Sequence, residues 1–152
     1  MQRIYPFIAA VSALVLAQVV KPFLYRRKNG EWDWITIIEG GGLPSSHSSL
    51  VTALTLSVGL QEGFSSTAFA ISLAFSLIIM FDAFNVRWYA GKNNEVTKQL
   101  IKDLQEKLDI ELDNPIYEEK LKPVLGHKAS EVLAGLILGL IIAIIYYYIL
   151  WR

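Results

Sequence analysis

Residues 132–151 read VLAGLILGLIIAIIYYYILW, a stretch without a charged side chain. A bilayer core of about 30 Å is crossed by about 20 predominantly apolar residues in a helix. Residues 4–23 and 66–84 have a similar length and composition. These three stretches predict transmembrane helices, and the chain is expected to be an integral membrane protein.

Residues 45–60 are a weaker candidate, because this stretch is shorter and begins with serines and a histidine. It can be a full span with a polar inner end or a helix that begins inside the protein, and we expect a span. Turn-forming residues at 61–65 join it to the next helix as an antiparallel hairpin. The N-terminal span leads into Lys21 without a small-residue cleavage site, so we expect it to be retained.

The distribution of Lys and Arg orients these segments. Arg3 and Arg152 lie on one side of the four-helix arrangement, and the other twelve of the fourteen basic residues lie on the opposite side. Because Lys and Arg concentrate in cytoplasmic loops, the loops at residues 24–44 and 88–130 are expected in the cytoplasm and both termini outside. The membrane is expected to be a bacterial inner membrane or an organelle membrane.

The second loop contains an amphipathic segment. Val96, Leu100, Leu104 and Leu108 recur at helical spacing among charged residues, which predicts a helix over residues 94–108 that lies on the membrane or caps the bundle. The predicted fold is therefore all-α: an integral membrane helical bundle of about four transmembrane helices with one amphipathic cytoplasmic helix. The chain is expected to be one domain, residues 1–152, with spans at about 4–23, 45–60, 66–87 and 131–151.

Composition narrows the classes of function. The chain of 152 residues is 53% hydrophobic, has a formal net charge of zero, and contains two histidines and no cysteine. Zero net charge gives no basic field for nucleic acid, and the absence of cysteine excludes disulfides and a cysteine nucleophile. The sequence has no evident carboxylate cluster for magnesium. We therefore expect no nucleic acid, metal or other cofactor.

The predicted bundle gathers its unusual polar residues at the inner face. Ionisable groups at membrane depth are costly and tend to mark function. Two histidines, two carboxylates and two cations facing one small volume are suited to binding and hydrolysing a phosphate group. The six residues are Lys21, His47, Asp82, Arg87, His127 and Glu131.

Residues 40–49, GGGLPSSHSS, combine glycines, a proline and serines before a helix. Backbone N–H groups at a helix N-terminus, with serine hydroxyls, form an anion site. Gly42, Ser45 and Ser46 are therefore candidate phosphate-binding residues. His47, in the first turn, could donate a proton to a leaving alkoxide. The alternative is a flexible loop with an N-capping serine.

His127 and Glu131 are separated by four positions and are expected to share one helix face. A carboxylate bound to one ring nitrogen fixes the tautomer, so that the other nitrogen can attack phosphorus. The alternative is simple helix capping by Glu131.

Arg87 ends an apolar helix abruptly. Its guanidinium offers a fork for two phosphate oxygens, whereas Lys21 offers a point charge, and both would stabilise a transferring phosphoryl group. Asp82 is expected to support the site by orienting Arg87. The alternative is positive-inside anchoring with an Asp82–Arg87 ion pair.

Three segments resemble the divergent subfamily of type 2 phosphatidic acid phosphatases, which are related to vanadium-dependent haloperoxidases. They are residues 41–48 (GGLPSSHS), residues 82–92 with DAFNVR and AGK, and residues 125–135 with LGH and EVLAG. The resemblance implies a phosphohistidine on His127, an orienting role for Glu131 and leaving-group protonation by His47. It also implies phosphate binding by Ser45, Ser46 and the backbone near Gly42, without a metal ion.

The sequence departs from the wider superfamily at several positions. Ser46 replaces a signature glycine, the first block is not matched, and the Ser-Arg pair expected upstream of His127 is absent. Arg87 can replace one missing arginine, and Lys21 or Lys122 can supply the other charge. The chain has about four spans where typical members have six, and a homodimer could complete the bundle.

The expected function is hydrolysis of a lipid phosphomonoester on the cytoplasmic side of a membrane. The substrate class includes phosphatidate, phosphatidylglycerophosphate and polyprenyl phosphate or diphosphate. The alternative is a non-catalytic membrane protein that binds lipid phosphates or assembles with partners. A transporter is disfavoured, because the middles of the spans lack the polar residues that an aqueous pathway needs.

Overall fold

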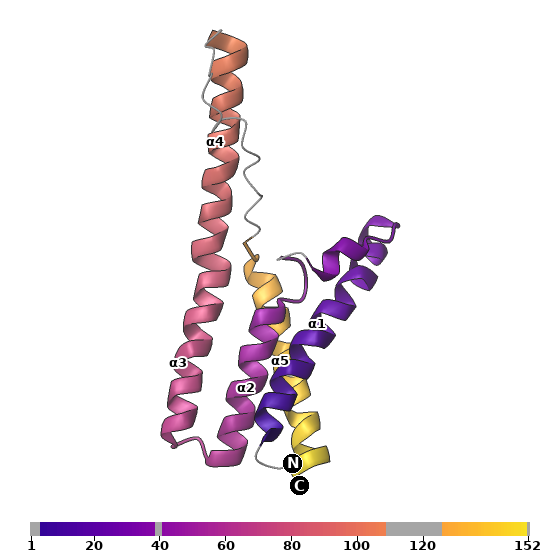
Figure 1. Cartoon of the computed structure of the whole chain (residues 1–152), viewed down its shortest axis with the longest axis vertical. Helices are drawn as coiled ribbons and strands as arrows, with labels where there is room; N and C mark the ends of the chain where they lie inside the picture. Colours follow the sequence, from indigo (N-terminus) through magenta and orange to yellow (C-terminus); the bar gives the residue numbers. More distant parts are fainter. Residues whose placement is uncertain (1–3, 39–40, 109–125, 152) are drawn as a thin grey trace.

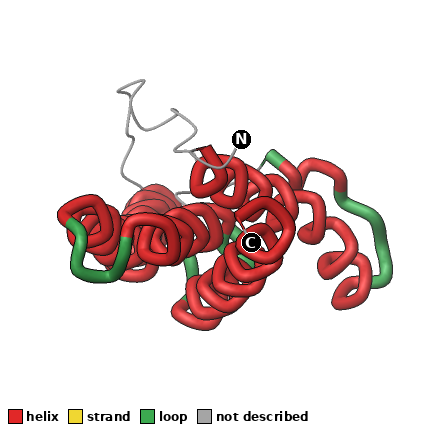
Figure 2. The backbone as a smooth tube through the Cα atoms, turned by 90° about the horizontal axis from the view of Figure 1, so that it is seen from below, coloured by secondary structure: helices red, strands yellow, loops and turns green. Residues whose placement is uncertain are grey.

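The computed structural model describes residues 4–38, 41–108 and 126–151, and all regular structure within these ranges is helical (Figure 1, Figure 2). The five long helices are α1 (Tyr5–Asn29), α2 (Ser46–Glu62), α3 (Thr67–Phe81), α4 (Arg87–Leu108) and α5 (Ala129–Tyr146). The short segments are a 3-10 helix, η2 (Trp34–Ile37), and two π-helical segments, η3 (Asp82–Val86) and η5 (Tyr147–Trp151).

Helix α2 lies at the centre of the bundle, where it packs against α1, α3 and α5. The core consists largely of small residues, with Ala13, Ala53 and Ala143 fully buried beside Ile142. Small side chains let helix backbones approach closely, and this contact stabilises helix pairs in lipid. The centre of the bundle is therefore held together by close backbone packing rather than by bulky side chains.

Buried hydroxyl groups join α2 to α3. The Ser76 hydroxyl donates to the Val51 carbonyl at 2.9 Å, and its oxygen lies 2.7 Å from the Thr55 hydroxyl. The Thr55 hydroxyl also donates to the Ser72 carbonyl at 3.1 Å. Such interhelical bonds contribute about 0.6 kcal/mol each on average in membrane proteins. They fix α2 and α3 as the antiparallel hairpin that the sequence predicts.

Among the described residues, three helices are long and apolar enough to cross a membrane: Tyr5–Asn29, the continuous helix Thr67–Lys107, and Ala129–Leu150. The predicted helical membrane bundle is confirmed, but α2 is not among these helices, so their number is three rather than about four. Helix α2 has 17 residues, and its Ser48, Ser49 and Ser57 are fully buried. Because other helices rather than lipid surround α2, its surface can be less apolar.

Helices α3 and α4 form one long rod through the π-helical segment η3 (Figure 1). The amphipathic helix predicted from Asn94 begins at Arg87 instead, and it extends away from the bundle rather than capping it. The reason is that no proline interrupts residues 67–108, so helical hydrogen bonding continues past the apolar part. Val96 and Leu100 are exposed on this extension.

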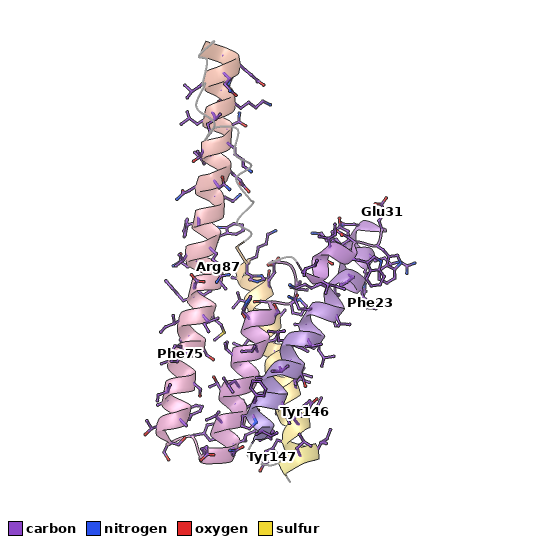
Figure 3. The ribbon with its side chains drawn as sticks, viewed as in Figure 1. Phe23, Glu31, Phe75, Arg87, Tyr146 and Tyr147 are labelled. Atoms are coloured by element: carbon purple, nitrogen blue, oxygen red, sulfur yellow. The ribbon has the colours of Figure 1, made fainter. Side chains whose placement is uncertain are left out.

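The two ends of the bundle differ in content. Both termini and the α2–α3 turn lie at one end (Figure 1), where Tyr146 and Tyr147 are also found (Figure 3). The last turns of α1, the first turns of α2 and α5, and the α3–α4 junction with Arg87 lie towards the opposite end (Figure 1, Figure 3). The candidate site is at this second end.

Candidate functional site

His127 lies just before α5, and only 5% of its surface is exposed. Its Nδ1 atom is 2.9 Å from Oε2 of Glu131, so the hydrogen bond expected from the spacing of these residues is present. Because a carboxylate can only accept, Nδ1 carries the proton and the lone pair is on Nε2. The same Oε2 accepts from the Lys128 backbone N–H at 3.3 Å. Glu131 therefore both caps α5 and orients His127.

The α3–α4 junction holds the backbone of His127. The His127 N–H donates to the Ala83 carbonyl, in η3, at 3.0 Å. Gly126 packs against the backbone of Arg87 and Trp88 so closely that a Cβ atom at Gly126 would collide with Trp88. π-Helical turns occur frequently at functional sites. Here the turn presents a carbonyl to the segment that carries His127.

The first turn of α2 is held closely against α5. The Ser45 N–H donates to the Glu131 carbonyl at 3.0 Å. A Cβ atom at Gly135 would collide with the Ser45 carbonyl, and one at Gly139 would lie 2.5 Å from the Ser49 carbonyl. The glycines of α5 thus allow the start of α2, which carries His47, to lie close to Glu131.

His47 is exposed, in contrast to His127. Partial loss of surrounding water lowers the pKa of His47 below its ordinary value, and Coulomb interactions with Arg87, His127 and Lys21 lower this pKa further. Asp82 opposes the shift. Because Coulomb interactions weaken with distance, Arg87, His127 and Lys21 each lie within electrostatic reach of His47.

Arg87 is paired with Asp82. Arg87 Nε lies 2.7 Å from Asp82 Oδ2, and 56% of the Arg87 side chain is exposed. The pair is the one that the sequence left open as an alternative to phosphate binding. A guanidinium has five N–H donors, so donors beyond Nε remain for a second partner.

Lys21 is buried, with 4% of its surface exposed. It adjoins the glycine loop, since a Cβ atom at Gly42 would lie 4.0 Å from Lys21 Cδ. Gly42 has a φ of +80°, a left-handed conformation that glycine adopts without steric cost. The side chain of Lys21 and the backbone of Gly42 are therefore neighbours, as a shared phosphate site would require.

The hydroxyl of Ser45 is engaged in capping α2. Its Oγ atom accepts from the Ser48 N–H at 3.4 Å and from the Ser48 hydroxyl at 3.0 Å. Both Ser45 and Ser46 are buried. Ser45 therefore makes the helix-capping contact that was one of the two alternatives from the sequence. Lys122, the other candidate cation, lies outside the described residues.

A cavity of about 680 Å³ adjoins the histidine–glutamate pair. We call it the α1 cavity, because the last turns of α1 form one wall. Lys21 and Glu131 line it, together with Gly42 and Trp88, whereas His47, His127 and Arg87 do not. The α1 cavity therefore adjoins the two imidazole rings without being lined by them.

Within the described part of the chain, no group of three or more His, Cys, Asp or Glu side chains is arranged to hold a metal ion. That the site works without a metal stays a prediction.

The sequence analysis gave no role of their own to Gly126, Trp88 or Lys128, although they lie in the segments that resemble the family. The only available signal was the glycine immediately before His127, because a glycine beside a functional residue can mark close backbone approach. Trp88 and Lys128 line the α1 cavity together with residues of α1. The cavity is formed by four separate segments, so no local spacing could reveal it.

The fold and this polar end define an all-helical, multi-pass membrane protein with a buried histidine–glutamate pair at one end of its bundle. The chain belongs to the divergent PAP2 family, whose sequence profile matches residues 3–142. It is also 37% identical over 152 residues to a Bacillus subtilis (strain 168) protein named "Uncharacterized membrane protein YuiD", covering 95% of this chain and 94% of that relative. No solved structure matches the chain significantly.

Proposed function

We propose that this protein hydrolyses a lipid phosphomonoester through a phosphohistidine formed on His127. The observation that carries the proposal is the hydrogen bond of 2.9 Å between His127 Nδ1 and Glu131 Oε2. It leaves the Nε2 lone pair as the nucleophile of the ring. Membership of the divergent PAP2 family supports a phosphatase-related activity.

In the first step, the Nε2 lone pair attacks phosphorus and the bond from phosphorus to the ester oxygen breaks. A protonated His47 gives its proton to the leaving alkoxide, which departs as the lipid alcohol. The imidazole of His127 gains positive charge as the P–N bond forms. The Glu131 carboxylate stabilises that charge through Nδ1–H, as a third group does in other histidine-based sites.

In the second step, a water molecule attacks phosphorus and the P–N bond breaks. His47, now neutral, accepts a proton from the water and is ready for the next turnover. Nε2 recovers its lone pair, and inorganic phosphate leaves. Each imidazole thus returns to its starting state without an external oxidant or reductant.

Positive groups near the two rings would stabilise the phosphoryl group during both steps. Arg87, oriented by Asp82, can bind two of its oxygens, and Lys21 adds a point charge. The backbone of Gly42 is the nearest part of the glycine loop to Lys21. These groups act on the charge that develops in the transition state, where such stabilisation is most effective.

The substrate is proposed to be an ester of the phosphatidate, phosphatidylglycerophosphate or polyprenyl phosphate class, reached from the cytoplasmic leaflet. The polar end carries the basic loops, which the positive-inside rule assigns to the cytoplasm. Because the chain contains no cysteine, single engineered cysteines can report orientation. Lys92→Cys should react with an impermeant reagent only from the cytoplasmic side, and Ser65→Cys, in the α2–α3 turn, only from the other side.

A non-catalytic lipid-phosphate binder is the second candidate. The ion pair between Arg87 and Asp82 favours it, because an arginine engaged by a carboxylate contributes less to a phosphate site. The two candidates differ in turnover rather than in binding.

The deciding experiment measures phosphate release from a panel of lipid phosphates by the detergent-purified full chain in the presence of a chelator. We expect release that is lost in His127→Ala and strongly reduced in His47→Ala. Lys102→Ala, further along the α4 extension, is the control and should retain full activity. Binding of the same lipids without release from any of them would favour the binder.

A further inference from the structure

The basic side chains of α4 and those around the α1 cavity differ in whether a carboxylate lies close to them. On α4, Lys92 pairs with Glu95 at 2.7 Å, Lys107 with Asp103 at 3.0 Å, and Lys102 with Glu106 at 3.8 Å. Around the α1 cavity, by contrast, no carboxylate of the described residues lies within ion-pairing distance of Arg27, Lys28 or Lys128. The cavity therefore combines concave shape with positive charge that the described part of the chain does not neutralise.

The lining of the α1 cavity is charged on one part and apolar on another. Four cations, Lys21, Arg27, Lys28 and Lys128, face a single carboxylate, Glu131, which is already bound to His127. The walls between them include Leu24, Tyr25, Leu43 and Trp88. Long basic side chains can bury their aliphatic stems while their charged ends stay in water. Such a lining fits an amphiphile whose anionic group meets the cations and whose hydrocarbon part meets the walls.

The volume of about 680 Å³ is within the range of small-molecule sites, about 300–1,000 Å³. His127, His47 and Arg87, which would contact the reacting phosphoryl group, do not line the cavity. Lys21, Gly42 and Glu131 belong to both places. The cavity is thus available to a second group while a phosphoryl group is held at the histidines.

We propose that the α1 cavity is a second anion-binding subsite, which takes the phosphate-type anionic group of an amphiphilic lipid beside the catalytic histidines. The anion can come from two sources: a second anionic group of the substrate itself, or a separate anionic lipid that occupies the cavity during turnover. Anion binding in the α1 cavity does not depend on catalysis. An effect of the bound anion on turnover rests on the proposed function.

The first test measures binding on the full-length His127→Ala protein in detergent. The probes are phosphatidylglycerol, a phosphodiester that a phosphomonoesterase cannot hydrolyse, and the zwitterionic phosphatidylcholine. We expect phosphatidylglycerol to bind the tighter of the two. Arg27→Gln and Lys128→Gln should each weaken it by about fivefold, because one cation near a lipid anion has an effect of that order.

Arg26→Gln is the matched control. Arg26 adjoins Arg27 on the same helix, but its guanidinium lies over the Trp32 ring at 4.6 Å from the ring centroid, and it does not line the cavity. We expect its substitution to change phosphatidylglycerol binding by less than about twofold. Equal losses in Arg26→Gln and Arg27→Gln, or no preference for phosphatidylglycerol in the parent protein, would overturn the subsite.

The second test adds phosphatidylglycerol to the wild-type protein as it hydrolyses phosphatidate. Acceleration that Arg27→Gln abolishes would identify a separate lipid as the occupant. Inhibition that Arg27→Gln relieves would indicate a second anionic group of the substrate, with which phosphatidylglycerol competes. An unchanged rate despite binding would overturn the link to turnover. If the wild type hydrolyses no lipid, the proposed function fails, and the binding test alone decides the subsite.

Discussion

The two histidines of this chain have the same side chain but opposite surroundings. His127 is 5% exposed, and its ring is fixed by Glu131 while its backbone is fixed by Ala83. His47 is exposed in the first turn of α2, and partial loss of surrounding water, together with nearby positive charges, lowers its pKa. A buried, oriented ring is suited to nucleophilic attack, whereas an exposed ring can exchange protons with a leaving group and with water. The difference in surroundings assigns a different proposed role to each histidine.

The largest expected effect comes from removing the Glu131 carboxylate that orients the His127 ring. In Glu131→Gln, the amide NH₂ can donate to Nδ1 and so favour the tautomer whose Nε2 is protonated and cannot attack. Replacing the corresponding carboxylate of a catalytic triad with an amide costs about 10⁴-fold in kcat, and we expect a loss of that order. Glu131→Asp, which keeps the charge, should recover part of the activity. Equal activity of the Gln and Asp variants would contradict the tautomer argument.

The next effect depends on the leaving group and separates the two roles. His47→Ala should slow hydrolysis of an alkyl phosphate by about 10²- to 10⁴-fold, the usual contribution of general acid–base catalysis. Formation of the phosphohistidine from an aryl phosphate should be affected much less, because a phenolate leaves without a proton. The comparison is made on the single-turnover burst of phenol release. Similar losses with both leaving groups would mean that His47 does not protonate the leaving group.

A smaller effect is expected from disturbing the backbone that holds His127. In Gly126→Ala, the new Cβ would collide with the backbone of Trp88, so the His127 segment must shift. A displacement of about 1 Å can cost about 100-fold in rate, and we expect a loss of this size in kcat with little change in thermal unfolding in detergent. An active Gly126→Ala protein would show that docking on the α3–α4 junction does not position His127.

The smallest effect concerns the pH profile. The limb of kcat/KM that reports deprotonation of His47 should lie below pH 6.5, because the pKa of His47 is lowered. His47 acts as an acid only when protonated, so activity falls as the pH rises through this limb. Arg87→Gln removes a positive charge that lowers the pKa of His47 and should therefore move the limb to higher pH. Lys92→Gln is the control, and a limb that stays in place in Arg87→Gln would contradict the proximity of Arg87 to His47.

Local spacing was sufficient for the parts of the structure that depend on few residues. The three long apolar stretches predict the three spanning helices, and the four-residue separation of His127 and Glu131 predicts their hydrogen bond. The capping contact of Ser45 was one of two alternatives, and it depends on where the Ser48 N–H lies. Phosphate binding by Ser45 stays a prediction.

Other features depend on contacts between distant segments and could not be derived from spacing. Helix α2 resembles a weak span in sequence, and its central position follows from packing against three other helices. The rod formed by α3 and α4 follows from the absence of a proline in residues 67–108. The sequence prediction ended the spanning helix near Arg87 because the polarity changes abruptly there. The α1 cavity needs residues from four segments at once.

The most direct test of the central proposal is to look for the phosphohistidine itself. In His47→Ala, an aryl phosphate should still transfer its phosphoryl group to His127, while the loss of the general base slows attack by water, so the intermediate should accumulate. After rapid quenching at alkaline pH, mass spectrometry should find one acid-labile phosphate on His127 and none in His47→Ala/His127→Ala. Release of phosphate at the wild-type rate with no phosphate on His127, or with phosphate on another residue, would contradict the account.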